Sequence, residues 1–170
     1  MKIGKMVHVF LIASAITTIS CEKDDTADKA DKELYDMAIE TVGFTWYKKS
    51  DALLEKSIGS GHSQPLLRTR YNEVAAASLD ENGKIMGNAM FAEGSLIVKE
   101  LYADESTLSQ YAILYKRNNS EFSDKDGWEW GYMNAKGDVI ESVSKKGNSC
   151  ISCHTQEGSI DHMLMNKYFP

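Results

Sequence analysis

The sequence predicts a mixed α+β domain in which an antiparallel β-meander is flanked by helices. Three segments rich in β-branched and aromatic residues follow one another closely in the second half of the chain, at residues 94–103, 109–117 and 127–144. Such segments at short spacing are typical of consecutive antiparallel strands. Of the 170 residues, 42% are apolar and 26% are charged, which is ordinary for a single globular domain with its own core.

The first 20 residues have the pattern of an export signal. Lys2 and Lys5 precede an apolar stretch that is too short to span a membrane and matches the apolar region of a signal peptide. The stretch ends at Cys21, as in bacterial lipoproteins. Residues 1–20 are therefore interpreted as a lipoprotein-type signal peptide and Cys21 as the lipidation site. The alternative is an ordinary secretory signal that happens to contain a cysteine.

Residues 21–33 are charged and contain almost no large apolar side chain. This composition predicts a solvated tether between the membrane and a domain at residues 34–170. The protein is therefore expected to be exported and membrane-anchored, facing the periplasm or the cell surface. The formal net charge is −6 and no basic cluster is present, so nucleic acid is not expected as a partner.

Helical spacing predicts a helix before the sheet, because Leu34, Met37, Ala38 and Val42 fall on one face. A short aromatic segment at residues 43–49 is β-prone and leads into a Gly/Ser-rich loop.

The segment "LLRTRY" at residues 66–71 predicts a strand whose alternation places Leu67 and Tyr71 on one face and the two arginines on the other. Asn72 is a good N-cap for a short helix that ends at Gly83.

The remaining elements complete the meander and its C-terminal cap. Residues 94–103 and 109–117 predict two strands, and residues 127–144 predict two more around the turn "NAKG". The segment 150–169 is expected to be helical on both sides of Gly158.

Two cysteines and a histidine form the motif C-x-x-C-H near the end of the sequence, at Cys150, Cys153 and His154. A structural zinc site normally has four protein ligands, and a histidine directly after a ligand cysteine does not match the usual spacing. A redox-active disulfide normally follows an early strand of a βαβ unit, and no such pattern surrounds these cysteines.

Covalently attached haem, haem c, explains every position of this motif. Each cysteine forms a thioether with one vinyl group, and the adjacent histidine binds the iron. Cys150 and Cys153 are therefore predicted to attach one haem, and His154 is predicted to be the proximal iron ligand on a C-terminal helix. The export signal agrees, because bacterial haem c is attached outside the cytoplasm.

The sixth iron position is expected to be open. Met163 and Met165 follow His154 too closely in sequence to pass easily to the opposite haem face, and core packing explains them. The methionines at positions 86, 90 and 133 remain alternative ligands. An open position suits small-ligand binding or catalysis better than simple electron transfer.

Six short motifs occur in an order found in a known family: "HSQPLLRTRYN", "FAEGSLIVKEL", "YAILYKR", "GWEWGY", "KGNSCISCH" and "IDHML". Over residues 40–170 the chain resembles the cytochrome P-460 family. The resemblance implies a β-rich mono-haem c fold, which the related cytochromes c′-β share and the four-helix cytochromes c′ do not.

The resemblance also implies a role for Lys99. In family members that act as enzymes, the corresponding lysine is joined covalently to a haem meso carbon. A lysine among apolar strand neighbours is unusual, because burial of an ammonium group is costly. The alternative is a solvent-facing Lys99 that pairs with Glu100 or with a neighbouring strand.

Family members of this kind oxidise hydroxylamine, with nitric oxide and nitrous oxide as products or intermediates. The resemblance implies Arg68 as a distal-side group, with a haem propionate or a surface ion pair as its alternative partner. Glu129 is a second catalytic candidate, but it alternates with two tryptophans and faces water if they pack in the core. His62 is expected in a loop, where it binds a propionate or caps a turn, and Asp161 is expected to cap the last helix.

The sequence therefore predicts an exported mono-haem c protein that converts small nitrogen species, hydroxylamine or nitric oxide, by redox chemistry. A non-catalytic NO- or CO-binding protein of the cytochrome c′-β kind and a periplasmic electron carrier are the alternatives. The expected partners are a small nitrogen ligand or substrate, a redox partner protein, the membrane and a second copy of the chain in a homodimer.

Overall fold

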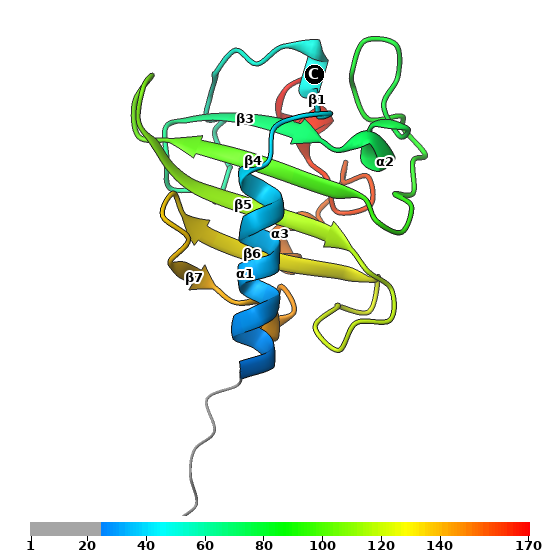
Figure 1. Ribbon diagram of the computed structural model, residues 1–170. Coiled ribbons are helices and arrows are strands. Elements are labelled where there is room, and N and C mark those ends of the chain that lie inside the picture. The colour runs from blue at the N-terminus through cyan, green and yellow to red at the C-terminus, as the bar shows by residue number, and fades with distance from the viewer. Residues whose placement is uncertain (1–24) are drawn as a thin grey trace, which may run out of the picture.

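The computed structural model describes residues 25–170, so the predicted signal peptide and Cys21 lie outside the described residues. The described chain forms a seven-stranded antiparallel sheet with a few short helices (Figure 1). This arrangement confirms the α+β class that the sequence predicts.

The elements follow one another in a simple order. The strands are β1 (Thr45–Trp46), β2 (Leu54–Glu55), β3 (Leu66–Tyr71), β4 (Leu96–Tyr102), β5 (Leu108–Lys116), β6 (Trp128–Asn134) and β7 (Val139–Glu141). The helices are α1 (Asp25–Ile39), α2 (Glu73–Ala76), α3 (Ile151–His154) and α4 (Met165–Tyr168), with single 3₁₀ turns η1 (Tyr47–Lys49) and η2 (Val143–Lys145).

Strands β3 to β7 lie side by side in chain order, which is the predicted meander. The register brings one row of residues across the middle of the sheet, because Lys99 pairs with Thr69 on one side and with Ala112 on the other, and Ala112 pairs with Tyr132. Their side chains point to the same face of the sheet, since paired residues share a face.

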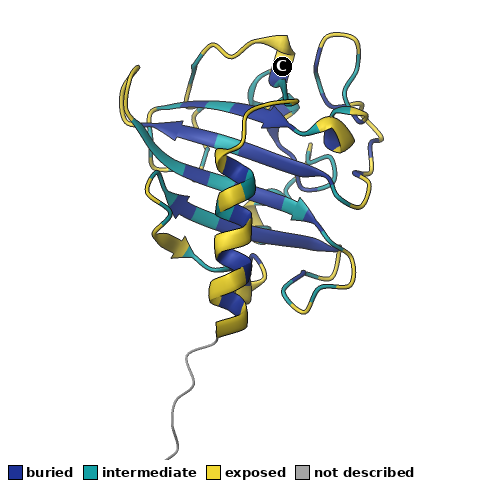
Figure 2. Ribbon diagram, in the orientation of Figure 1, coloured by how far each residue is buried: buried dark blue, intermediate teal, exposed yellow. Residues whose placement is uncertain are grey.

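Both faces of the sheet are covered. Helix α1 crosses one face, and the segment that carries α3 and α4 lies on the other (Figure 1). The buried side chains form two clusters accordingly: one contains Leu34 of α1 with Val98 and Met133, and the other contains Leu67, Trp130 and Met165. Figure 2 shows α1 buried along the stripe that faces the sheet and exposed on its outer side.

Helix α1 begins at Asp25, inside the segment 21–33 that the sequence analysis interprets as a tether. Ala27 and Ala30 are buried against the sheet, and Asp31 is 2% exposed and accepts a hydrogen bond from the Val143 amide at 2.8 Å. Within residues 25–33, the two alanines and Asp31 form a contact face against the sheet, and the other charged side chains point outward.

The C-terminal end of α1 is fixed to the sheet by Arg70, whose side chain is fully buried. Its guanidinium donates hydrogen bonds to the carbonyls of Ala38 and Glu40, and its Nε donates to Glu100 Oε1 at 2.9 Å. Glu100 is 3% exposed and also accepts from Arg68 Nε at 2.6 Å.

The helices outside α1 are shorter than the sequence predicts. Asn72 caps α2 as expected, with its side chain accepting from the Ala75 amide, but α2 is a single turn. Helices α3 and α4 are single turns as well, and Gly158, Asp161 and His162 between them have positive φ, which a helix does not allow. No described helix is long and apolar enough to cross a membrane.

Candidate functional site

A cavity of about 320 Å³ opens on the sheet face opposite α1. The loop at residues 59–63 and the segment at residues 149–169 form its walls, and the central strands form its floor. Side chains with chemistry of their own line it: His62, Lys99, Tyr132, Cys150, Cys153 and His154. The cavity therefore brings together the C-x-x-C-H motif and the lysine of β4, which are far apart in sequence.

The ring of His154 is oriented by one hydrogen bond. Its Nδ1 lies 2.7 Å from the backbone carbonyl of His162. A carbonyl only accepts, so Nδ1 carries the proton and Nε2 keeps a lone pair free for a metal. Burial lowers the pKa of His154 to about 4, and the nearby charge of Lys99 adds to this effect.

A glycine lets the C-x-x-C-H segment lie against the sheet. Gly147 has φ +68, and a Cβ at this position would lie 2.6 Å from atoms of the Trp130 ring. The Gly147 carbonyl accepts hydrogen bonds from the amides of Cys150 and Ile151, which starts the turn of α3. The same Trp130 ring packs edge to face against His154, with centroids 5.1 Å apart.

Lys99 projects from the middle of β4 into this cavity and is half-buried. Burial lowers its pKa to about 8. Among the described residues that line the cavity it is the single lysine or arginine. Lys99 thus faces the C-x-x-C-H motif, whereas its neighbour Glu100 belongs to the opposite face of the sheet.

Arg68 does not line the cavity. It lies on the α1 side of the sheet, where Nε donates to Glu100, Nη2 donates to Tyr102 Oη at 2.7 Å and the guanidinium stacks over the Trp46 ring at 4.5 Å. The candidate role at the distal side of a haem is therefore not supported by its position. Arg68 does form an ion pair, but with the buried carboxylate of Glu100 rather than at the surface.

Glu129 also lies on the α1 side, but it does not face water as expected. Its side chain is 1% exposed, because α1 covers the face that the sequence analysis takes to be solvent-exposed. Neither carboxylate oxygen has a hydrogen-bond partner among the described residues, and the closest cation is Arg117, with Nη1 at 3.6 Å. Arg117 in turn binds Glu33 of α1 at 2.6 Å.

Comparison with known proteins decides the family. The model of the cytochrome P460 family matches residues 45–164, most of the chain. The chain belongs to the cytochrome P460 family. Comparison with curated proteins gives no significant match. Membership of the cytochrome P460 family implies a haem protein, and it agrees with the resemblance carried by the short motifs.

The cavity of this cytochrome P460 domain fits a haem held by the predicted residues. Both thiols, Cys150 and Cys153, are free, and both line the cavity together with His154. The single turn of α3 joins the second cysteine directly to a histidine whose Nε2 is available as a ligand. Leu67 and Phe169 supply apolar wall, as expected around a flat apolar macrocycle.

The methionines differ in their access to the cavity. Met133 is fully buried on the α1 side of the sheet, and Met86 and Met90 are exposed. Met165 does line the cavity, and its sulfur accepts a hydrogen bond from Thr69 Oγ1 at 3.3 Å. Met163 packs in the core, as expected.

Two further residues of the cavity, His62 and Tyr132, contact each other. His62 lies in a loop as predicted, and its ring stacks on Tyr132 with centroids 5.9 Å apart. It also approaches His154, at 6.4 Å between centroids, and burial lowers its pKa to about 3. The only available signal is the start of a recognisable motif at His62, which does not indicate where a loop side chain points.

These placements predict that Glu129→Gln leaves the haem site unchanged. The substitution removes a charge on the α1 side of the sheet and touches no residue of the cavity. We expect the haem content and the absorption spectrum of the holoprotein to equal those of the wild type. Optical spectroscopy measures both, and a changed spectrum at unchanged stability would contradict this placement.

Proposed function

We propose that this protein is an exported haem c protein in which Cys150 and Cys153 attach the haem and His154 binds the iron. Each thiol would add across one vinyl group, forming a carbon–sulfur bond while the thiol hydrogen passes to the neighbouring vinyl carbon. The observation that supports this proposal is the convergence of two free thiols and an oriented imidazole in one cavity.

We further propose redox conversion of small nitrogen species, hydroxylamine or nitric oxide. A bound haem would supply an iron that binds such ligands and exchanges electrons with them. The proposal of an enzyme rests on Lys99, because its amine lies in the same cavity as His154. This amine is the group that can bond to the macrocycle or transfer a proton. Tyr132, His62 and the loop at residues 59–63 line the same space.

Two other functions differ in the iron coordination that they require. A non-catalytic NO- or CO-binding protein needs an open iron position and no bond to Lys99. An electron carrier needs a sixth protein ligand, and Met165 is the one methionine among the described residues that lines the cavity. Its hydrogen bond from Thr69 competes with such a role. The spectrum of the reduced protein, with and without carbon monoxide, distinguishes these cases.

The cellular setting belongs to the same proposal. The apolar stretch before Cys21 supports export and a lipid anchor at the membrane, facing the periplasm or the cell surface. Electrons released by substrate oxidation need an acceptor, so a redox partner protein is proposed, and a homodimer is a further proposed assembly.

Substitution of both thiols tests the attachment. We expect Cys150→Ser with Cys153→Ser to lose all covalent haem, because a serine hydroxyl does not add to the vinyl groups. Haem staining of a denaturing gel and the intact mass measure this loss.

Cys21→Ser provides the matched control. It should keep covalent haem and move the protein from the membrane fraction to the soluble fraction. Covalent haem that persists in the double variant would refute the attachment residues, whereas a Cys21 variant that stays in the membrane would refute only the lipid anchor.

A further inference from the structure

The turn that contacts His154 has an unfavourable backbone. Asp161 has φ +42 and His162 has φ +69, and neither is glycine. Two successive residues of this kind in the left-handed region are uncommon, and such a conformation costs free energy unless the surroundings stabilise it. The carbonyl that accepts the hydrogen bond from His154 Nδ1 belongs to the second of these residues.

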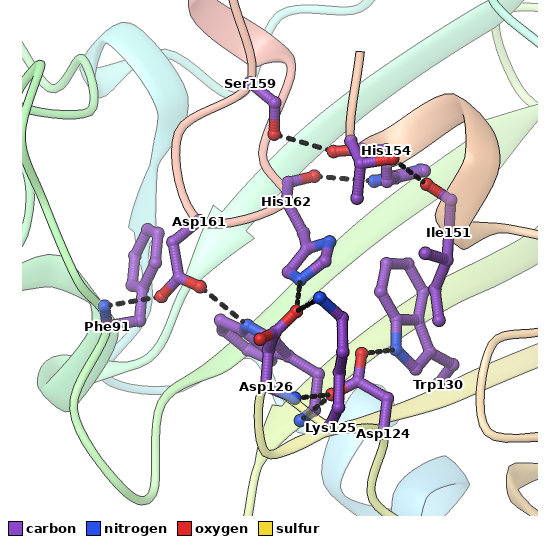
Figure 3. Close-up of polar contacts among 12 residues, drawn as sticks. Phe91, Asp124, Lys125, Asp126, Trp130, Ile151, His154, Ser159, Asp161 and His162 are labelled. Atoms are coloured by element: carbon purple, nitrogen blue, oxygen red, sulfur yellow. Dashed lines mark hydrogen bonds and ion pairs between the residues drawn. The ribbon is translucent and has the colours of Figure 1, made fainter.

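The side chain of Asp161 supplies much of this stabilisation. It is 3% exposed and accepts hydrogen bonds from the Phe91 amide at 2.8 Å and from Trp128 Nε1 at 3.0 Å. The ammonium of Lys116 lies 3.6 Å from the same carboxylate and compensates its buried charge. One carboxylate thus joins the turn to the segment before β4, to β5 and to β6 (Figure 3 shows the bond to Phe91).

His162 is fixed as well. Its Nε2 donates to Asp126 Oδ2 at 3.0 Å, and its ring packs edge to face on Trp130, which also contacts His154. Ser159 Oγ donates to the His154 carbonyl at 2.6 Å, so the backbone of the ligand residue is bonded to the same loop (Figure 3).

We infer that Asp161 is a positioning residue for His154. Its carboxylate stabilises the left-handed turn that presents the His162 carbonyl to Nδ1, and this bond orients the ring and increases its electron donation to iron. Stronger donation stabilises the ferric state, so Asp161 lowers the midpoint potential of the iron. The inference rests on the proposed function in one respect, namely that His154 is the axial ligand.

The test uses the holoprotein with Asp161→Ala. We expect the iron–histidine stretch of the ferrous protein, measured by resonance Raman spectroscopy, to move to lower frequency. The midpoint potential should rise by about 59 mV or more, which is a tenfold change in the one-electron equilibrium. Asp161→Asn should give a smaller shift in the same direction, because asparagine tolerates the left-handed region and keeps one acceptor oxygen.

Asp104→Ala is the matched control. Asp104 accepts hydrogen bonds from Ser106 and Thr107 in an exposed turn between β4 and β5, away from His154. It should leave the stretch and the potential unchanged. If Asp161→Ala folds poorly, Asp161→Asn carries the test by the same two measurements.

The outcomes separate this inference from the proposed function. Variants at Asp161 that unfold at lower temperature with the wild-type stretch and potential would show a role in stability alone and overturn the inference. A wild-type protein that binds haem but shows no iron–histidine stretch in the five-coordinate ferrous state would overturn the proposed axial ligand instead.

Discussion

Lys99→Met is expected to slow the proposed hydroxylamine oxidation strongly while leaving the proposed covalent attachment of the haem intact. Methionine has nearly the length of lysine and suits the apolar floor of the cavity, so the substitution removes the amine with little change in packing. Loss of a positioned proton-transfer group typically lowers the rate about 10²–10⁴-fold. We expect turnover of Lys99→Met to fall by at least this factor. Hydroxylamine-dependent reduction of an artificial electron acceptor measures it.

Spectroscopy and mass distinguish a haem–lysine bond from a purely electrostatic role of Lys99. Forming the bond would remove one N–H and one C–H hydrogen as two protons and two electrons, which an external two-electron oxidant such as a peroxide would take up. The wild-type holoprotein would then be lighter than the sum of the chain and the haem, and its reduced Soret band would be red-shifted. Both signs should vanish in Lys99→Met.

Lys99→Arg keeps the positive charge without the reactive amine, and Lys136→Met changes an exposed lysine in the turn after β6. The arginine variant should lose the signs of the bond, and the Lys136 variant should match the wild type. An unchanged spectrum and rate in Lys99→Met would exclude both roles. A wild-type protein with five-coordinate haem, nitric oxide binding and no turnover would favour the gas-binding alternative.

Arg70→Met should lower the free energy of unfolding by about 3–5 kcal/mol, the usual cost of removing one partner of a buried ion pair. The substitution leaves Glu100, which is 3% exposed, with Arg68 as its remaining cation. It also leaves the carbonyls of Ala38 and Glu40 without their donor at the end of α1. Urea unfolding at constant m-value measures this loss.

The surface pair Lys32–Asp36 provides the control. Their side chains are 71% and 53% exposed, and exposed pairs contribute about 0–1 kcal/mol, so Lys32→Met should change the unfolding midpoint little. Combining Arg70→Met with Glu100→Gln should recover part of the loss, because the uncompensated buried charge disappears. An Arg70→Met cost as small as that of Lys32→Met would show that the buried network contributes little.

The strands were predictable because alternation is a local property. The pattern of "LLRTRY" places Arg68 and Arg70 opposite Leu67, as observed. What covers each face depends on distant segments. Glu129 is expected in water and is buried, since α1 packs over its face, and the alanines that make this contact do not stand out in a charged segment.

The candidate site was predictable where its residues are contiguous in sequence or marked by their neighbours. The residues of the C-x-x-C-H motif are contiguous, and Lys99 is marked by its apolar neighbours, so their presence in one cavity agrees with expectation. Arg68 is separated from the cavity by the sheet itself, which a motif alone does not reveal. From its residue type, Asp161 is expected to be a helix cap. Its left-handed backbone, which brings it to Phe91 and Trp128 instead, cannot be predicted from residue type alone.

Side chains in the central strands alternate between the two faces of the sheet, so adjacent residues serve different needs: one lines the cavity and the next helps to hold α1 in place. Lys99 and Glu100 are neighbours in β4, yet one faces the cavity and the other holds the arginines that secure α1. Evolution can therefore alter the reactivity of the cavity by exchanging single cavity-facing side chains, while the ionic scaffold behind the sheet stays intact. An insertion or deletion of one residue in β4 would exchange the two faces, placing a carboxylate in the cavity and an amine beside Arg70. Substitutions can therefore change the chemistry of this strand while keeping the fold, whereas a change in its length would disrupt both faces.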